Sequence, residues 1–418
     1  MRKAWRAIRS VYYWPSEIVR HLYNLARHGP DSWYRVTAPW IINRGYPDAA
    51  VGNRRARPAG WYHFRHQFTF TGEHVIFNID YARRAADVKG LALIFFMGMG
   101  DYFFSTPLIR ALKQRYPDLP IIAFASRNAG QVNSPLLEQL LKADPNINEV
   151  RAFDGRQTRR YKNYDYRDAL RQVPSGYLAL PVLYDHLPDT QHRVTSLFET
   201  FGLKPPNEPP PPLLHLPPSP PPHVAELLEK IKRLAGQQGA RGIVFMQLDA
   251  RSSHYNYPYA DNLTQGLVER GYFVVSASSL SSPPAACHML DFKQFAIMDS
   301  IYLLKLLRNA FSEMYIVSVA SVFWSVSAGF GIPNLGMQHF PDDAMHNYWY
   351  PNITVITHRP YPKLPAKKQI PAKPGDYELD GRGLAVFLPD YVLKNFDIMI
   401  SESLHGSQQE IMAQSLRA

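Results

Sequence analysis

The sequence predicts an α/β fold with two Rossmann-like domains. Two long regions each alternate short apolar runs of strand length with segments of helical periodicity, an order typical of a parallel sheet covered by helices. A proline-rich segment at residues 204–222, which favours polyproline II and cannot form a helix, separates the two regions. At 418 residues and 46% apolar content, the chain can form two such cores with extensions. The expected parts are 1–88, an accessory region; 89–203, the first domain; 204–222, a linker; 223–385, the second domain; and 386–418, a helical segment.

The first 30 residues are basic, with a single acidic residue, Glu17. Ser16 and Glu17 can start a helix whose apolar side includes Ile18 and Leu22. A basic, aromatic, amphipathic segment of this kind can lie in a bilayer surface and be held by anionic lipids. The alternative is a helix packed on the protein's own core, and the sequence leaves both open. The basic residues are Arg2, Lys3, Arg6, Arg9, Arg20 and Arg27.

The rest of the accessory region resembles a small strand hairpin. Three aromatic or β-branched runs, at 61–64, 68–70 and 75–77, surround a turn at Gly72 and Glu73. Arginines interleaved with aromatic residues also occur on nucleic-acid-binding surfaces, but no signature of a known RNA-binding or DNA-binding module accompanies them here. We therefore expect no nucleic-acid partner.

The stretch from Leu91 to Pro107 predicts a strand, a tight turn and a helix start. Leu91–Met97 is uninterrupted and apolar, as in a strand that is buried on both faces of a parallel sheet. A helix is expected to begin near Ser105, with Pro107 close to a first-turn position, and to end at Pro117.

Asp101 would then stand at the carboxyl end of a central strand, where open α/β sheets place their ligand crevice. Gly98 and Gly100 allow a close approach of the backbone, so a nucleotide phosphate could sit on their amides. Asp101 could equally satisfy amides at the turn or helix start. Local sequence does not decide between these two roles.

Several ordered motifs make residues 97–154 resemble the amino-terminal half of the family 9 glycosyltransferases, the group of the lipopolysaccharide heptosyltransferases. That family shows a glycine turn with an aspartate, a T-P-x-x-x-x-L helix, a P-D-x-x-I strand and a segment near N-P-x-I-x-E-V. The counterparts here are Gly100 and Asp101; Thr106, Pro107 and Leu112; Pro117, Asp118 and Ile121; and Asp144 to Val150.

The resemblance implies the GT-B architecture, with two Rossmann-like domains facing across a cleft. It implies an inverting, metal-independent and cofactor-free transferase of bacterial envelope polysaccharide synthesis, which moves a heptose or other hexose-type sugar from a nucleotide diphosphate donor to a glycan, lipopolysaccharide or protein acceptor. Residues 89–203 would bind the acceptor, and residues 223–385 would bind the nucleotide sugar. Asp101 would be the catalytic base.

After the linker the α/β alternation resumes. Strands are expected at 242–248, 272–277 and 314–319, and helices at 259–270, 300–310 and 322–330. The family's donor motif, a strand followed by D-S/T-G-x-x-H, corresponds here to Ala320, Ser321, Val322 and Ser325. Only Ser321 keeps the polar type, although the helix exit at Gly331-Ile332-Pro333 matches.

The start of the helix at 322–330 can still bind a diphosphate through its free amides, with hydroxyl groups from Ser321 and Ser325. Arg251 and His254 could compensate for the missing histidine, and Gln338 with His339 would lie in a further loop of the same cleft. Each of these could instead be a solvated loop residue or a satisfied polar core group. The missing aspartate and histidine also leave open an inactive nucleotide-binding, sugar-binding or scaffold protein.

Other chemistries find little support. The one cysteine, Cys287, excludes a disulfide framework and any CxxC zinc site, and no Walker A, GxSxG or HExxH pattern occurs. No apolar stretch is long enough to span a membrane, so we expect a cytoplasmic protein, peripheral on the inner face of the cytoplasmic membrane if residues 1–30 bind lipid. The net charge of +11 favours a negatively charged partner such as a nucleotide sugar or anionic lipid.

Overall fold

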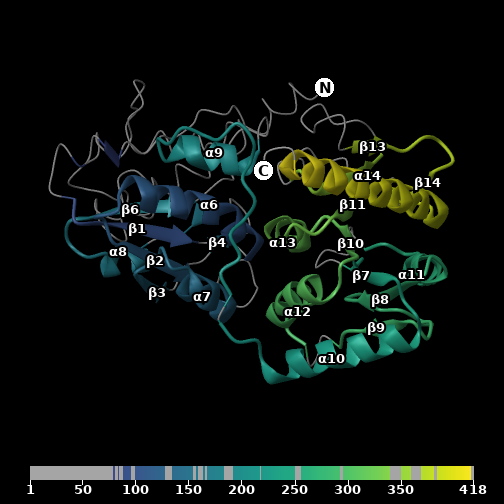
Figure 1. Ribbon diagram of the computed structural model, residues 1–418. Coiled ribbons are helices and arrows are strands. Elements are labelled where there is room, and N and C mark those ends of the chain that lie inside the picture. The colour runs from purple at the N-terminus through teal and green to yellow at the C-terminus, as the bar shows by residue number, and fades with distance from the viewer. Residues whose placement is uncertain are drawn as a thin grey trace. The chain divides into compact units, whose positions relative to one another are not determined.

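The computed structural model divides into two compact units, residues 1–210 and 211–418 (Figure 1). The boundary falls within the proline-rich segment. Each unit contains a parallel sheet with helices, which confirms the predicted fold class. The predictions for residues 1–78 lie outside the described residues. The structure describes residues 79–80, 83, 88–95, 99–127, 134–153, 157–158, 163–164, 167–182, 192–216, 218–249, 256–291, 295–338, 350–358, 369–380 and 384–415.

The first unit is built on a four-stranded sheet with the order β3-β2-β1-β6, in which all neighbours are parallel. The strands are β1 (Gly90–Phe95), β2 (Ile121–Ser126), β3 (Glu149–Phe153) and β6 (Tyr177–Val182). Every residue of β1 and β2 is buried, as expected for central strands that helices cover on both faces. The chain order reverses between β1 and β6.

Helices α6 to α9 belong to the described part of this unit, together with a short antiparallel strand pair. The helices are α6 (Met99–Arg115), α7 (Ser134–Ala143), α8 (Arg167–Gln172) and α9 (Arg193–Thr200), and the strands are β4 (Gln157–Thr158) and β5 (Asn163–Tyr164).

Helix α6 corrects one sequence prediction. It begins at Met99 rather than near Ser105, so Pro107 lies inside the helix and not in its first turn. Proline has no N–H to give to the carbonyl four residues earlier, which here belongs to Phe103. The hydroxyl of Thr106 donates to that carbonyl at 2.9 Å, and this bond replaces the missing one. With the Thr106 hydroxyl in place, the helix continues through Pro107. From the sequence alone, Pro107 had indicated the start of the helix.

The second unit has a seven-stranded parallel sheet with the order β13-β12-β11-β10-β7-β8-β9. In chain order, β7 is the first strand, and β8 and β9 are added on one side of it. Strand β10 then pairs with β7 on its other side, and β11, β12 and β13 extend the sheet in that direction. This is the Rossmann strand order. The strands are β7 (Gly242–Gln247), β8 (Tyr272–Ser276), β9 (Cys287–Met289), β10 (Met314–Val319), β11 (Asn334–Gln338), β12 (Ile353–Thr357) and β13 (Gln369–Pro371).

The helices of this unit agree closely with the periodicity of the sequence, although α12 begins three residues earlier than predicted. They are α10 (Pro222–Gln237), α11 (Ala260–Glu269), α12 (Ile297–Ala310), α13 (Val322–Phe330) and α14 (Pro389–Ser415), and a strand pair, β14 (Tyr377–Leu379) and β15 (Ala385–Phe387), precedes α14. Pro222 occupies the first helical position of α10, where its missing N–H costs nothing.

The first half of α14 packs against α11, β11 and β12 (Figure 1). Gly266 of α11 allows the close approach, because a Cβ there would lie 2.3 Å from Cδ1 of Leu393. The Arg270 guanidinium donates to the Asp397 carboxylate at 3.0 to 3.2 Å. These contacts make α14 part of the second core. Within the described residues, no helix is both long and apolar enough to cross a membrane.

Candidate functional site

Each sheet has one position at which the strand order reverses, between β1 and β6 in the first unit and between β7 and β10 in the second. We call these the first and second switch points. Open α/β sheets bind ligands beyond the carboxyl ends of the strands at such points, because the flanking loops diverge there. The candidate residues Asp101 and Ser321 each follow a strand that borders one of them.

Asp101 lies in the first turn of α6, shortly after β1. The structure thus places it at the carboxyl edge of the sheet, beside the first switch point. Gly100 belongs to the same turn, while Gly98 and the side chain of Asp101 lie outside the described residues. The role of Asp101 as a base stays a prediction.

A buried tyrosine anchors this first turn. Tyr102, only 1% exposed, donates its hydroxyl to the Leu140 carbonyl of α7 at 3.2 Å, and the same hydroxyl lies 3.5 Å from Oδ2 of Asp144. Burial, and secondarily the Asp144 charge, raise the pKa of Tyr102 well above its ordinary value, so the phenol stays protonated and donates. The position next to Asp101 is therefore tied to α7 and the turn after it.

The motif from Asp144 to Val150 builds that turn. Oδ1 of Asp144 accepts from both the backbone N–H and the side-chain amide of Asn146, each at 2.9 Å. Asn148 pairs with the start of β2, since its side-chain oxygen accepts from the Ile121 N–H at 2.8 Å and its own N–H donates to the Ile121 carbonyl at 2.8 Å. These motif residues therefore build the turn to which Tyr102 is tied.

Ser321 begins α13 at the second switch point. Its backbone is extended, and its hydroxyl oxygen accepts from the Phe323 N–H at 3.3 Å, so Ser321 is the N-cap. The same hydroxyl donates to Oε1 of Gln247, the last residue of β7, at 2.6 Å. The Gln247 amide in turn donates to the carbonyl of Asp249. A chain of hydrogen bonds therefore crosses from β10 to β7.

The loop after β7 is held by Ser278, in the loop after β8. The Ser278 hydroxyl accepts from the N–H groups of Leu248 at 2.5 Å and Asp249 at 3.2 Å, and the Asp249 carboxylate accepts from the Ser279 N–H at 2.9 Å. These bonds hold the backbone at Leu248 and Asp249, directly after β7. Arg251 and His254 themselves lie outside the described residues.

Sequence reasoning did not assign roles to Gln247 and Ser278. Gln247 did carry a signal, because it is the single polar residue in an otherwise apolar strand, GIVFMQ. A polar residue at the carboxyl end of a buried strand needs a hydrogen-bond partner. The identity of that partner, Ser321, depends on the strand order.

The other donor-site candidates occupy different positions. Ser325 lies one turn further along α13 and is 1% exposed, and Gln338 ends β11 and is 2% exposed. His339 lies outside the described residues. Helix α13 sits close to β11 because Gly336 makes room for the Trp324 indole; a Cβ at Gly336 would lie 2.5 Å from Cζ2 of that ring.

The second switch point is thus a capped helix start with polar loops and is suited to an anion. The first N–H groups of a helix have no partners within the helix, and the helix dipole adds positive potential there. Among the described residues, no group of three or more His, Cys, Asp or Glu side chains is arranged to hold a metal ion. Burial raises the pKa of the Cys287 thiol to about 12, which makes it a poor nucleophile.

No family model matches the chain, and no curated protein matches its sequence. The structure is similar to a family 9 glycosyl transferase from Veillonella parvula, with 12% identity over 76% of this chain and 98% of the other and a TM-score of 0.49. It is similar to an Escherichia coli ADP-heptose lipopolysaccharide heptosyltransferase II, with 14% identity over 75% and 99% and a TM-score of 0.47. An E. coli heptosyltransferase with ADP shares 11% identity over 63% and 92%, with a TM-score of 0.35. Each is a similarity of fold, so the function is argued below from this chain's own residues.

Proposed function

We propose that the chain is an inverting glycosyltransferase, which moves a heptose or another hexose-type sugar from a nucleotide diphosphate donor to a glycan, lipopolysaccharide or protein acceptor. The observation that carries the proposal is the Ser321-capped start of α13 at the second switch point. Free helix amides and the helix dipole are a general binding site for a diphosphate. The sequence motifs of the first unit add the resemblance to family 9 glycosyltransferases.

In the proposed reaction, the bond between the anomeric carbon and the diphosphate oxygen breaks, and its electron pair leaves with the diphosphate. The α13 amides and the Arg251 cation stabilise the charge that develops on this leaving group. The Gln247–Ser321 hydrogen bond holds the start of α13, so the amides need little rearrangement as the charge develops. Further contacts to the nucleotide sugar are proposed for Gly98, Gly100, His254, Ser325, Gln338 and His339.

The acceptor hydroxyl attacks the opposite face of the anomeric carbon and forms the new carbon–oxygen bond with inversion. A carboxylate within reach of that hydroxyl takes its proton during the attack. Asp101 is the proposed base, because β1 and α6 bring it to the ligand edge of the first sheet. The protein would bind the acceptor through residues 89–203.

A specific observation favours a second candidate, a nucleotide-binding or sugar-binding protein without catalysis. Ala320, where the resembled family has an aspartate, is apolar and 6% exposed. Val322 and Ser325 likewise replace the glycine and the histidine of that motif. Diphosphate binding at a helix start does not need these side chains, whereas a transfer reaction could depend on them.

Calorimetric titration with ADP, GDP, UDP and the matching nucleosides tests the donor site, and assays of donor hydrolysis and transfer test turnover. The transferase proposal predicts that one diphosphate binds at least about tenfold more tightly than its nucleoside, since the diphosphate contacts are charge-assisted. It also predicts turnover with the corresponding sugar donor. Binding without turnover across the donor panel would establish the non-catalytic candidate, and no diphosphate binding would exclude both.

We also propose that residues 1–30 hold the protein peripherally on an anionic membrane surface facing the cytoplasm. Deletion of these residues should release the protein from vesicles that contain phosphatidylglycerol, while activity on a soluble acceptor persists, because the charged and apolar contacts to lipid are lost together. Sedimentation with these vesicles, and with neutral phosphatidylcholine vesicles as the control, measures the effect. Lack of binding by the full chain at low salt would instead place this segment on the protein core.

A further inference from the structure

An open hollow of about 510 Å³ lies in the first unit, at the end of α6 opposite to Asp101. The last turns of α6 form one wall, the segment before β1 forms a second, and the chain after α9 forms a third. Because α6 has 17 residues, its two ends are about 25 Å apart. The hollow is therefore separate from the first switch point. Its polar lining residues are Asp80, Arg83, Gln114, Arg115, Tyr116 and Lys204.

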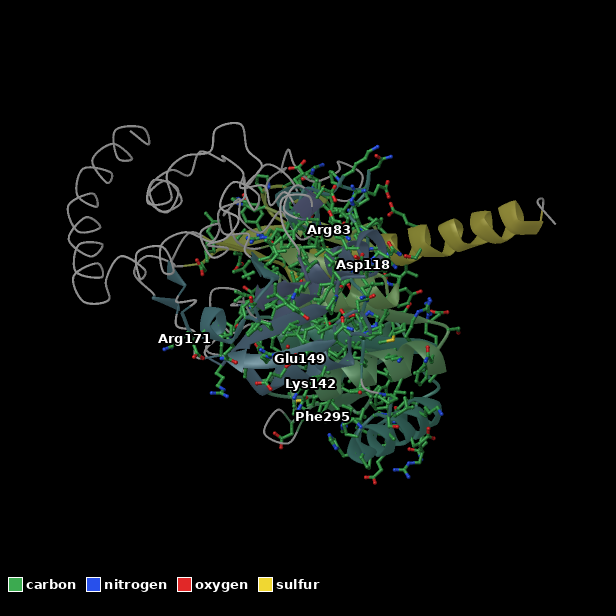
Figure 2. All side chains as sticks on the ribbon, turned by 90° about the vertical axis from the view of Figure 1, so that its left-hand side faces the viewer. Arg83, Asp118, Lys142, Glu149, Arg171 and Phe295 are labelled. Carbon is green, nitrogen blue, oxygen red and sulfur yellow. The ribbon has the colours of Figure 1, made fainter. Side chains whose placement is uncertain are left out.

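Two arginines are held in place around one aromatic ring. The guanidinium carbons of Arg83 and Arg115 lie 5.4 and 5.9 Å from the centroid of the Tyr116 ring. The Tyr116 hydroxyl donates to Asp80 at 2.8 Å, and Nη2 of Arg115 lies 2.7 Å from the same carboxylate. Figure 2 shows Arg83 beside Asp118, to which its Nη2 donates at 2.6 Å. The two cationic side chains are thus ordered without a ligand.

The lining of the hollow carries more positive than negative charge. Arg83, Arg115 and Lys204 face it together with a single carboxylate, Asp80. Each arginine makes its ion pair through one terminal nitrogen, and a guanidinium has five N–H donors, so donors remain on both. Lys204 is exposed and has no ion pair among the described residues.

The carboxyl end of a helix repels anions, but here that effect is reduced. Lys113 donates from Nζ to the carbonyls of Pro117 and Leu119, each at 3.1 Å, just beyond the last turn of α6. Cations in the last helical turn offset the negative end of the dipole, and Arg115 lies there as well.

We propose that this hollow binds a phosphate group, carried either by a soluble phosphoester or by a lipid headgroup. Arginine forks match phosphate oxygens in two parallel hydrogen bonds, and a lysine adds a mobile point charge. The Gln114 amide can supply a neutral donor beside them. The described lining residues of the hollow all belong to the first unit and include none of the residues proposed for the donor diphosphate site, and its occupancy is measured without any turnover.

The test compares two double variants of the full chain. Arg115→Gln with Lys204→Gln removes two cations from the hollow, while Lys142→Gln with Arg171→Gln removes one lysine and one arginine elsewhere in the same unit. Lys142 and Arg171 are 61% and 66% exposed, and Figure 2 shows both away from Arg83. Titration with inorganic pyrophosphate probes soluble anions, and sedimentation with phosphatidic acid vesicles against phosphatidylcholine vesicles probes headgroups.

The hollow variant is expected to bind pyrophosphate at least about tenfold more weakly than the parent chain, and the control variant less than about twofold more weakly, since charge-assisted contacts to phosphate are the strong ones. This result would assign a soluble phosphate compound as the ligand of the hollow. If pyrophosphate does not bind but the hollow variant alone loses vesicle binding, the site takes headgroups. Equal effects of the two variants in both assays would overturn the proposal.

Two further variants separate this site from folding and from the donor site. Lys204→Gln alone should still weaken binding by about threefold, and because Lys204 makes no described ion pair its loss leaves the fold intact. Ser321→Ala should leave binding at the hollow unchanged. If Ser321→Ala abolishes all pyrophosphate binding while the hollow variant has no effect, the anion site is the donor site and this inference fails.

Discussion

The two switch points have the same topology but opposite chemistry. At the first, helix α6 begins at Met99 and carries an acidic residue, Asp101, in its first turn, which is anchored from the protein interior through Tyr102. At the second, helix α13 begins with a neutral hydroxyl, Ser321, and is tied across the sheet to Gln247. A carboxylate at a helix start occupies the positive end of the dipole, whereas a serine cap leaves that potential available to a ligand.

Under the proposed function, this difference would give one fold two roles. The strand order alone determines where each ligand edge lies. The first residues of the following helix then determine whether that edge carries a negative side chain of the protein or can bind a negatively charged ligand. A transfer reaction needs both, because it takes a proton from one substrate and stabilises a negative leaving group on the other.

The largest expected effect follows from Asp101→Asn. Turnover should fall by at least about a hundredfold, the usual scale for loss of a general base, while the fold and donor affinity stay almost unchanged. Steady-state kinetics, calorimetric donor titration and thermal unfolding measure these quantities. Asp168→Asn, at an exposed ion pair of α8, is the matched control and should keep its turnover. Full activity of Asp101→Asn would end its assignment as the base, and a collapse of stability would make it a structural residue.

The next effect tests the opposite chemistry of the second switch point. Ser321→Ala with Arg251→Gln should weaken nucleotide diphosphate binding by at least about tenfold, because each charge-assisted or dipole-aligned contact contributes about 1.5 to 3 kcal/mol. Arg308→Gln with Ser312→Ala, at exposed positions of the same unit, is the control. Ser321→Thr should restore most of the affinity, since it keeps the capping hydroxyl. Unchanged affinity for every nucleotide would exclude the proposed donor site, and only the similarity of fold to glycosyltransferases would remain.

A third variant tests the anchor under the first switch point. Asp144→Ala removes the acceptor for both Asn146 bonds and the carboxylate near Tyr102, so the free energy of unfolding should fall by about 2 to 3 kcal/mol. Urea unfolding measures it. Asp144→Asn keeps one oxygen acceptor and should lose less. Asp118→Ala breaks an exposed ion pair and should lose under about 1 kcal/mol. Similar losses for Asp144→Ala and Asp118→Ala would show that the turn does not anchor α6.

The smallest effect concerns the proline within α6. Thr106→Val keeps the shape of the side chain but removes the hydroxyl that donates to the Phe103 carbonyl, so stability should fall by about 1 kcal/mol. Thr106→Ser keeps the donor and should retain most of that stability in the same urea experiment. If the two variants unfold alike, the hydroxyl does not replace the hydrogen bond that Pro107 cannot make.

Much of the fold could be predicted from the sequence. The central strands β1, β7 and β10 are almost wholly apolar, with Gln247 and Ser318 as the polar exceptions, because helices cover both their faces. Helix α13 was predicted with its observed bounds, since Ser321 caps its start and Gly331, with φ of 63°, ends it. The predicted start of α6 was wrong, because in the local sequence a proline indicates the first turn of a helix. The Thr106 hydroxyl that keeps Pro107 inside the helix is visible only with the chain folded.

The sequence by itself determined the strands, most helix bounds and the position of Asp101 after a buried strand, because these follow from local periodicity and turn chemistry. Only the tertiary structure decided which distant residues meet. Gln247 bonds to Ser321 across 74 positions, and Tyr102 reaches Asp144 across 42. The Arg83 and Arg115 side chains gather on the Tyr116 ring in the same way. Such partners depend on strand order and helix packing, which long-range burial selects and which no short stretch of sequence contains.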